Sequence, residues 1–139
     1  MGRLIRMQVR AIIIGLLGGI LTALIAWSPL IPDPIVFHTV SLTMIGAIYM
    51  GFAFADGRPS IVFLELSVAT VFIVLSLLGL WVAPLFIGLG LVLHGFWDLA
   101  HHPRGIKTKI PVWYPPFCAA FDFLFAGVFF YLARNIANK

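Results

Sequence analysis

Apolar residues form five long runs along the chain, and short segments rich in proline, glycine and charge separate them. A helix needs about 20 mostly apolar residues to cross about 30 Å of hydrocarbon. Each run is close to that length. We therefore predict five transmembrane helices, at residues 11–27, 35–55, 61–81, 84–102 and 115–133. The expected fold class is an all-α, polytopic membrane bundle formed by residues 1–139 as a single domain.

The segments between the runs contain residues that end or begin helices. The proline-rich stretch 29–34 cannot continue a helix, and the stretch 56–59 (Asp-Gly-Arg-Pro) is typical of a turn. Ser60 is a candidate N-cap for the third run. Pro84 suits the first turn of the fourth run, which is expected to stop at residues 103–105.

The first run is expected to stay in the mature protein. A basic start followed by an apolar stretch is also typical of a secretory signal. However, cleavage after Ala26 would put Leu24 at the third position before the cut, where a small residue is needed.

Basic residues in the loops predict the orientation in the membrane. Lys and Arg favour the cytoplasmic side of membrane proteins. With the amino terminus inside, the cytoplasmic side holds seven basic residues, namely Arg3, Arg6, Arg10, Arg58, Arg104, Lys107 and Lys109. The outer side holds only Arg134 and Lys139. We therefore predict a cytoplasmic N-terminus and an outside C-terminus, in an integral membrane protein of the bacterial inner membrane.

Composition excludes several other classes of protein. With 62% hydrophobic and 10% charged residues and a mean hydropathy of +1.09, the chain is too apolar for a soluble domain. The single cysteine, Cys118, excludes a disulfide framework or a cysteine-built zinc site. The net charge of +4 is small and follows from the loops, so no nucleic-acid partner is expected.

Ionisable residues inside the predicted spans are the candidates for chemistry, because each is costly in hydrocarbon. His94, Asp98, His101 and His102 have the spacing i, i+4, i+7 and i+8, which puts them on one face of the fourth helix. At 1.5 Å per residue, His94 lies about 10 Å from the cytoplasmic end of its helix.

Two more carboxylates lie at similar depths on neighbouring helices. Asp122 is about 10 Å from the start of the fifth span, and Glu65 is about 7 to 8 Å into the third. We expect three helices to bring three carboxylates and three imidazoles into one layer of the inner leaflet.

Such a layer suits a divalent transition metal such as Fe or Zn, which binds imidazole nitrogen and carboxylate oxygen. The candidate metal ligands are His94, Asp98, His101, His102 and Asp122. Without a metal, the candidate acid–base residues are Glu65, His94, Asp98 and Asp122. The competing interpretation is that these groups pair only to hold the helices together.

Three functions are compatible with this layer. The first is an intramembrane enzyme that acts on a lipid or another apolar small molecule. Its substrate pocket would be formed by nearby aromatic residues, namely Phe96, Trp97, Trp113, Tyr114, Phe117 and Phe121. The second is a metal-ion or proton-coupled binding or transport protein. The third is a structural membrane subunit. Clustering in one leaflet favours the enzyme.

Several segments resemble those of an uncharacterised family of small bacterial and fungal integral membrane proteins. They are Ala55-Asp-Gly-Arg58, the stretch His94-Gly-Phe-Trp-Asp98-Leu-Ala-His-His102, and Trp113-Tyr-Pro-Pro-Phe-Cys118 through Asp122. This resemblance implies a membrane protein and no activity. The His94…His101-His102 run is also similar in part to the histidine boxes of membrane hydroxylases and desaturases. Those enzymes gather about eight histidines, whereas this chain has four.

Other polar and small residues have simpler interpretations. His38 is predicted near the outer end of the second span, too far from the layer to be a ligand, and Cys118 is predicted to pack in the fifth helix. Gly15 and Gly19 form a small-xxx-small pair that permits a close helix contact. That contact lies either within the chain or in a homo-oligomer.

Overall fold

The computed structural model describes residues 2–102 and 105–137, and five helices account for most of this part of the chain. The helices are α1 (Gly2–Ala26), α2 (Pro34–Asp56), α3 (Pro59–Trp81), α4 (Leu85–Ala100) and α5 (Tyr114–Ala137). This all-α architecture confirms the predicted fold class. Arg104 and Lys139, which entered the charge count, lie outside the described residues.

Four of these helices, α1, α2, α3 and α5, are long and apolar enough to cross a membrane. They indicate an integral membrane protein. The fourth predicted span, 84–102, needs correction, because α4 has only 16 residues and is about 24 Å long. Pro84 precedes it as the N-cap, and the backbone leaves the helix at His101.

Helix ends differ from the apolar runs because a helix can continue into polar sequence. Helix α1 begins at Gly2 and so includes the three arginines that precede the first run. The predicted N-cap Ser60 is wrong: α3 begins one residue earlier at Pro59, whose fixed φ suits a first helical position. Asp33 caps α2, since its side chain accepts hydrogen bonds from the backbone N–H groups of Ile35 and Val36.

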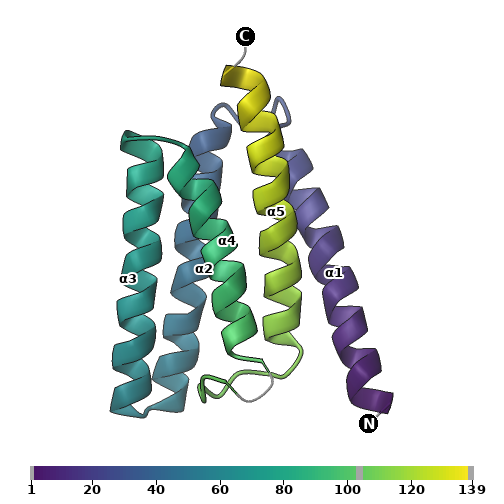
Figure 1. The fold of residues 1–139 in the computed structure, drawn as a ribbon, viewed down its shortest axis with the longest axis vertical. Coiled ribbons are helices and arrows are strands. Elements are labelled where there is room, and N and C mark those ends of the chain that lie inside the picture. The colour runs from purple at the N-terminus through teal and green to yellow at the C-terminus, as the bar shows by residue number, and fades with distance from the viewer. Residues whose placement is uncertain (1, 103–104, 138–139) are drawn as a thin grey trace.

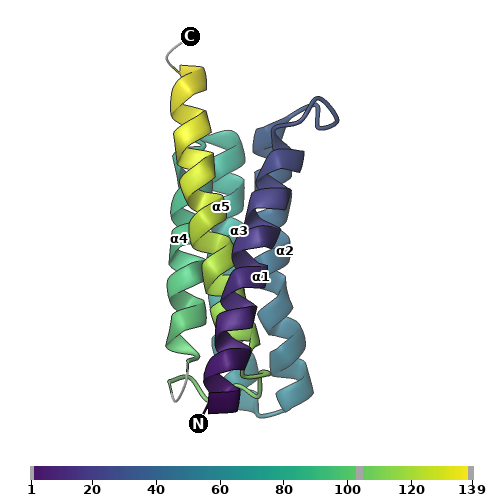
Figure 2. The same ribbon diagram turned by 90° about the vertical axis from the view of Figure 1, so that its right-hand side faces the viewer.

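The helices run alternately up and down, so the two ends of the chain lie at opposite ends of the bundle (Figure 1). We call the end that holds the start of α1, the α2–α3 turn and the α4–α5 connection the lower end. Helix α2 packs mainly against α3, and α4 packs against both α3 and α5. Helix α1 packs mainly along α5 at the outside of the bundle (Figure 2).

Small residues allow α1 to approach α5 closely. A Cβ atom at Gly15 would lie 2.2 Å from the backbone oxygen of Phe117, and one at Gly19 would lie 3.1 Å from that of Phe121. The predicted close contact is therefore confirmed within one chain. In this structure α5 occupies the face that Gly15 and Gly19 present.

The bundle interior changes character along its length. The upper half has an apolar core that includes Leu42, Ile87, Leu91, Phe125 and Phe129. The lower half instead buries ionisable side chains, namely Asp56, Glu65, His94, Asp98, His101 and Asp122. All the buried carboxylates of the described residues thus lie in the lower half, while the upper half buries one ionisable side chain among them, His38.

Candidate functional site

The centre of the lower half is a triad of His94, Asp98 and Asp122, which we call the central triad. The first two are one turn apart on α4, and Asp122 comes from the facing α5. His94 Nδ1 lies 2.7 Å from Asp122 Oδ2 and 3.4 Å from Asp98 Oδ2. All three side chains are fully buried, and each offers a ligand atom within 4.8 Å of the other two.

Tyr49 of α2 completes the surroundings of the triad. Its hydroxyl donates a hydrogen bond of 2.5 Å to Asp98 Oδ1. A hydroxyl bonded to a carboxylate forms a short, charge-assisted hydrogen bond, which holds Asp98 in one orientation. Three helices therefore position the site, and each supplies at least one polar side chain.

Several buried atoms of the triad have no hydrogen-bond partner. They are His94 Nε2, Asp98 Oδ2 and Asp122 Oδ1. A neutral imidazole has one N–H, and a neutral His94 beside an ionised Asp122 would carry it on Nδ1, 2.7 Å from Asp122 Oδ2. Buried polar atoms without partners are rare in folded proteins and are costly. The triad therefore has unused ligand capacity in a place closed to solvent.

A second polar cluster lies beside the triad, and we call it the Glu65 group: Glu65, Trp97, His101 and Thr108. Glu65 Oε1 lies 2.9 Å from His101 Nε2 and accepts a hydrogen bond from the Thr108 hydroxyl. The Trp97 indole N–H donates to Glu65 Oε2 at 3.3 Å. His101 Nδ1 lies 2.9 Å from the backbone oxygen of Trp97.

Donor and acceptor chemistry shows that the Glu65 group shares a proton. His101 Nδ1 must donate, because its partner is a carbonyl oxygen. A hydrogen bond between His101 Nε2 and Glu65 then needs one further proton, either on the imidazole or on the carboxyl. Within the Glu65 group, His101 and Glu65 are therefore hydrogen-bonded to each other through one shared proton. The central triad differs, because it has buried polar atoms without partners.

Tyr49 lies between the two clusters. Its ring centroid is 5.5 Å from that of His94 and 4.7 Å from that of His101. A cavity of about 200 Å³ at the lower end is lined by His101 and Thr108 together with residues of the α4–α5 connection. The Glu65 group thus borders a space near the surface, while the triad lies behind Tyr49.

The structure separates the residues that the sequence placed in one layer. His94, Asp98 and Asp122 come together, whereas His101 faces Glu65 and does not join them. His102 also stays apart, because its Nε2 lies 3.3 Å from the side-chain amide of Gln8. His101 shares the helix face of His94 but lies seven residues along the chain, which is about 10.5 Å or two turns and too far to join the same ligand set.

The predicted pocket aromatics do not line one common space. Trp97 belongs to the Glu65 group, and Tyr114 and Phe117 pack in the cluster that contains Tyr49 and Cys118. Phe121 packs against Phe125 of the upper core. Two residues lie elsewhere: Phe96 is 58% exposed and Trp113 is 44% exposed, so both face outward.

The α4–α5 connection is tied to the α2–α3 turn. Asp56 accepts two hydrogen bonds from the Arg58 guanidinium and one from the backbone N–H of Lys109. Arg58 also donates to the backbone oxygen of Lys107. The hydrogen bonds from Arg58 to Asp56 raise the pKa of the guanidinium. These contacts hold the segment that carries Thr108 over the Glu65 group.

His38 is distant from the triad, as predicted, but it is fully buried. Its ring stacks on Phe125 with centroids 4.5 Å apart, and its Nδ1 lies 2.6 Å from the backbone oxygen of Pro34. It therefore belongs to the upper core.

Sequence reasoning missed Tyr49 and Thr108. Tyr49 carries a hydroxyl in the middle of an otherwise apolar stretch of α2, which is the one signal that could have identified it. Thr108 lies in a loop, and nothing in the sequence indicates that this loop folds back onto Glu65.

Comparison with known proteins identifies a family for this chain but gives no activity. No curated protein and no solved structure matches the chain significantly. A model of a protein family described as a family of unknown function (DUF6010) matches residues 6–135. Because this match spans all five helices, the chain belongs to the DUF6010 family.

Proposed function

We propose that this protein is an intramembrane enzyme that acts on a lipid or another apolar molecule at a divalent transition metal, Fe or Zn, held by the central triad. The observation that carries the proposal is the convergence of one imidazole and two carboxylates with three unpartnered atoms, all fully buried. Groups that pair only to hold helices together would be expected to satisfy one another, as the Glu65 group does.

Charge balance supports a cation of charge +2. Two ionised carboxylates in a low-dielectric interior repel each other and are strongly penalised by desolvation. When His94 is neutral, neither it nor the Tyr49 hydroxyl neutralises them. A divalent ion would bring the net charge of Asp98, Asp122 and His94 to zero without an added proton.

The donor set fits such an ion. Imidazole nitrogen and carboxylate oxygen suit Zn and Fe, and catalytic sites use three protein ligands so that one position stays open. Tyr49 would fix the orientation of Asp98, and partners of this kind tune metal ligands in other proteins. A bound metal would polarise the substrate or activate water.

The chain's own residues would supply protons and exclude water. The Glu65 group holds a shared proton beside a cavity of about 200 Å³, and the Tyr49 ring separates it from the triad. We propose that this group exchanges protons with the surface while the Tyr49 ring limits the access of bulk water to the triad. Transport is less well supported, because the buried polar residues described in the upper half are few, namely His38, Thr39 and Ser76, and none of them is a carboxylate.

Elemental analysis of the protein purified in mild detergent tests the metal. We expect about one transition-metal ion per chain, and loss of that ion in Asp122→Asn and His94→Ala. Glu65→Gln is the matched control, because it changes a fully buried carboxylate outside the triad and should keep the metal. A metal-free protein that also takes up no Zn or Fe on dialysis would contradict the metal site, as would equal metal content in all variants.

Turnover is tested separately with a total lipid extract. The wild-type protein and the folded Asp122→Asn variant are incubated with the extract, and lipid masses are compared by mass spectrometry. We expect a mass change or a new isomer only with the wild-type protein. Identical lipid profiles in the presence of bound metal would contradict the enzyme and leave a metal-binding protein.

A second candidate is acid–base catalysis without a metal. The 2.7 Å contact between His94 Nδ1 and Asp122 Oδ2 favours it, since this pair could pass a proton to or from a substrate. A metal-free wild-type protein that still converts a lipid would support this candidate over the metal enzyme.

A further inference from the structure

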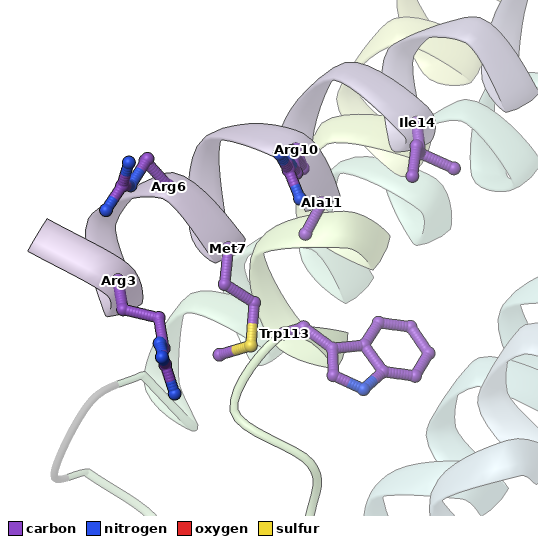
Figure 3. A pocket seen from close by; sticks show the side chains of 7 residues that line it. All are labelled: Arg3, Arg6, Met7, Arg10, Ala11, Ile14 and Trp113. Carbon is purple, nitrogen blue, oxygen red and sulfur yellow. The ribbon is translucent and has the colours of Figure 1, made fainter.

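A groove on the outside of the bundle carries positive charge without a counter-charge. It has a volume of about 420 Å³ and lies at the lower end, between the first turns of α1 and the start of α5. Its lining includes Arg3, Arg6 and Arg10 from α1 and Trp113 from the segment before α5. Figure 3 shows Met7 between Arg3 and the Trp113 indole.

The three arginines are free to bind an anion. They have the spacing i, i+3 and i+7, so they follow one side of α1, and all three are exposed. The groove has no acidic lining residue. Among the described residues, none of these arginines takes part in an ion pair, and only Arg6 has a hydrogen bond, to the backbone oxygen of Gly2.

The other end of the groove is apolar. Ile14, which is 58% exposed, continues the lining beyond Arg10, and the Trp113 indole is 44% exposed beside it. From Ile12 onward, α1 presents a nearly continuous exposed apolar surface that suits contact with lipid chains. The groove therefore changes from cationic to apolar at the depth where lipid headgroups meet acyl chains. Tryptophan is enriched at that depth in membrane proteins.

We propose that this groove binds an anionic phospholipid, with its phosphate at the arginines and the start of an acyl chain along Ile14 and Trp113. The guanidinium fork matches phosphate geometry, and clustered arginines beside a span attract anionic lipid. This site is outside the bundle and does not depend on the metal of the central triad. Its ligand is a membrane lipid, because a free phosphate would leave the apolar end of the groove unused.

Quenching of Trp113 fluorescence by brominated lipids tests the site. The protein is reconstituted in phosphatidylcholine vesicles that contain increasing brominated phosphatidylglycerol or, in parallel, brominated phosphatidylcholine. The Trp113→Phe variant isolates the Trp113 signal from that of the other three tryptophans. We expect half-maximal quenching of Trp113 at a fraction of the anionic lipid that is lower by roughly fivefold or more, since each arginine near anionic lipid contributes roughly fivefold in affinity.

Two double variants that lose the same charge distinguish lipid binding in the groove from nonspecific electrostatic attraction of anionic lipid. Arg3→Gln/Arg10→Gln should remove the preference, whereas Lys107→Gln/Lys109→Gln, which loses the same charge at the same end outside the groove, should keep it within about twofold. Millimolar inorganic phosphate should not displace the lipid. An equal loss of the preference for anionic lipid in both double variants would overturn the proposal. Equal quenching by the two lipids, or full displacement of the lipid by phosphate, would also overturn it.

Discussion

At the scale of single residues, the lower half of the bundle depends on a few hydroxyl and imidazole groups placed against carboxylates. Tyr49 connects the two clusters, because it donates to Asp98 and its ring lies against both His94 and His101. Its hydroxyl can be removed without a change of ring volume, so a substitution there isolates one hydrogen bond.

Tyr49→Phe should destabilise the protein and weaken its metal site. Loss of a hydrogen bond to a buried carboxylate costs about 1.5 to 3 kcal/mol. Loss of a partner that orients a metal ligand lowers metal affinity about 10- to 100-fold. Chemical unfolding in detergent and metal titration measure the two effects. Tyr131→Phe is the control, because Tyr131 is 69% exposed, and equal behaviour of both variants would contradict the role of Tyr49.

The triad could be predicted from the sequence in part. The i, i+4 spacing brings His94 and Asp98 together on α4, and equal depth brings Asp122 close to them. The separate pairing of His101 with Glu65 could not be predicted. It depends on how α3 and α4 are rotated and placed against each other, which local sequence spacing does not determine.

At the scale of elements, the contact between α1 and α5 depends on two glycines of α1, which have no side chains to hold the helices apart. The five helices and most of their boundaries follow from apolar runs and prolines. In contrast, the α1–α5 pairing follows from Gly15 and Gly19, and the sequence left open whether they face a neighbour in the chain or another copy. Apolar helices carry little information about their neighbours, because lipid and protein interiors are similarly apolar.

Gly15→Ala should therefore destabilise the protein, although alanine favours helix. Its Cβ would meet the backbone of Phe117 at 2.2 Å, and overpacking of this kind costs about 1 to 3 kcal/mol. Gly51→Ala is the matched control in α2, where nothing lies within 4 Å of the added Cβ. It should stabilise by about 0.5 to 1 kcal/mol. Thermal unfolding in detergent measures both, and stabilisation by Gly15→Ala would argue against the close packing.

The hydrogen bonds that join the α2–α3 turn to the α4–α5 connection lead to another prediction. Asp56→Ala removes the acceptor for Arg58 and for the backbone of Lys109. The connection should then open more often, and tryptic cleavage after Lys107 and Lys109 should become roughly tenfold faster, since cleavage follows the population of open states. Asp33→Ala, which removes a helix cap at the opposite end, should leave that cleavage rate unchanged.

At the scale of the whole molecule, polar chemistry and positive charge share one end. The buried carboxylates, the cavity beside His101 and Thr108, and the arginine groove all lie in the lower half, while the upper half has a mainly apolar core. A site closed on one side by that core exchanges substrate and protons through the lower end or sideways through the bilayer. The orientation in the membrane then determines which leaflet lies beside this site.

The distribution of Lys and Arg predicts that the lower end faces the cytoplasm. In a Cys118→Ala background, Leu30→Cys marks the upper α1–α2 loop, where Leu30 is 82% exposed, and Lys107→Cys marks the exposed lower connection. A membrane-impermeant maleimide should label the first in intact cells and the second only after permeabilisation. This pattern would place the arginine groove beside the cytoplasmic leaflet, which is rich in anionic lipid in many membranes. The reverse pattern would contradict the predicted orientation and would put both the groove and the central triad in the outer leaflet.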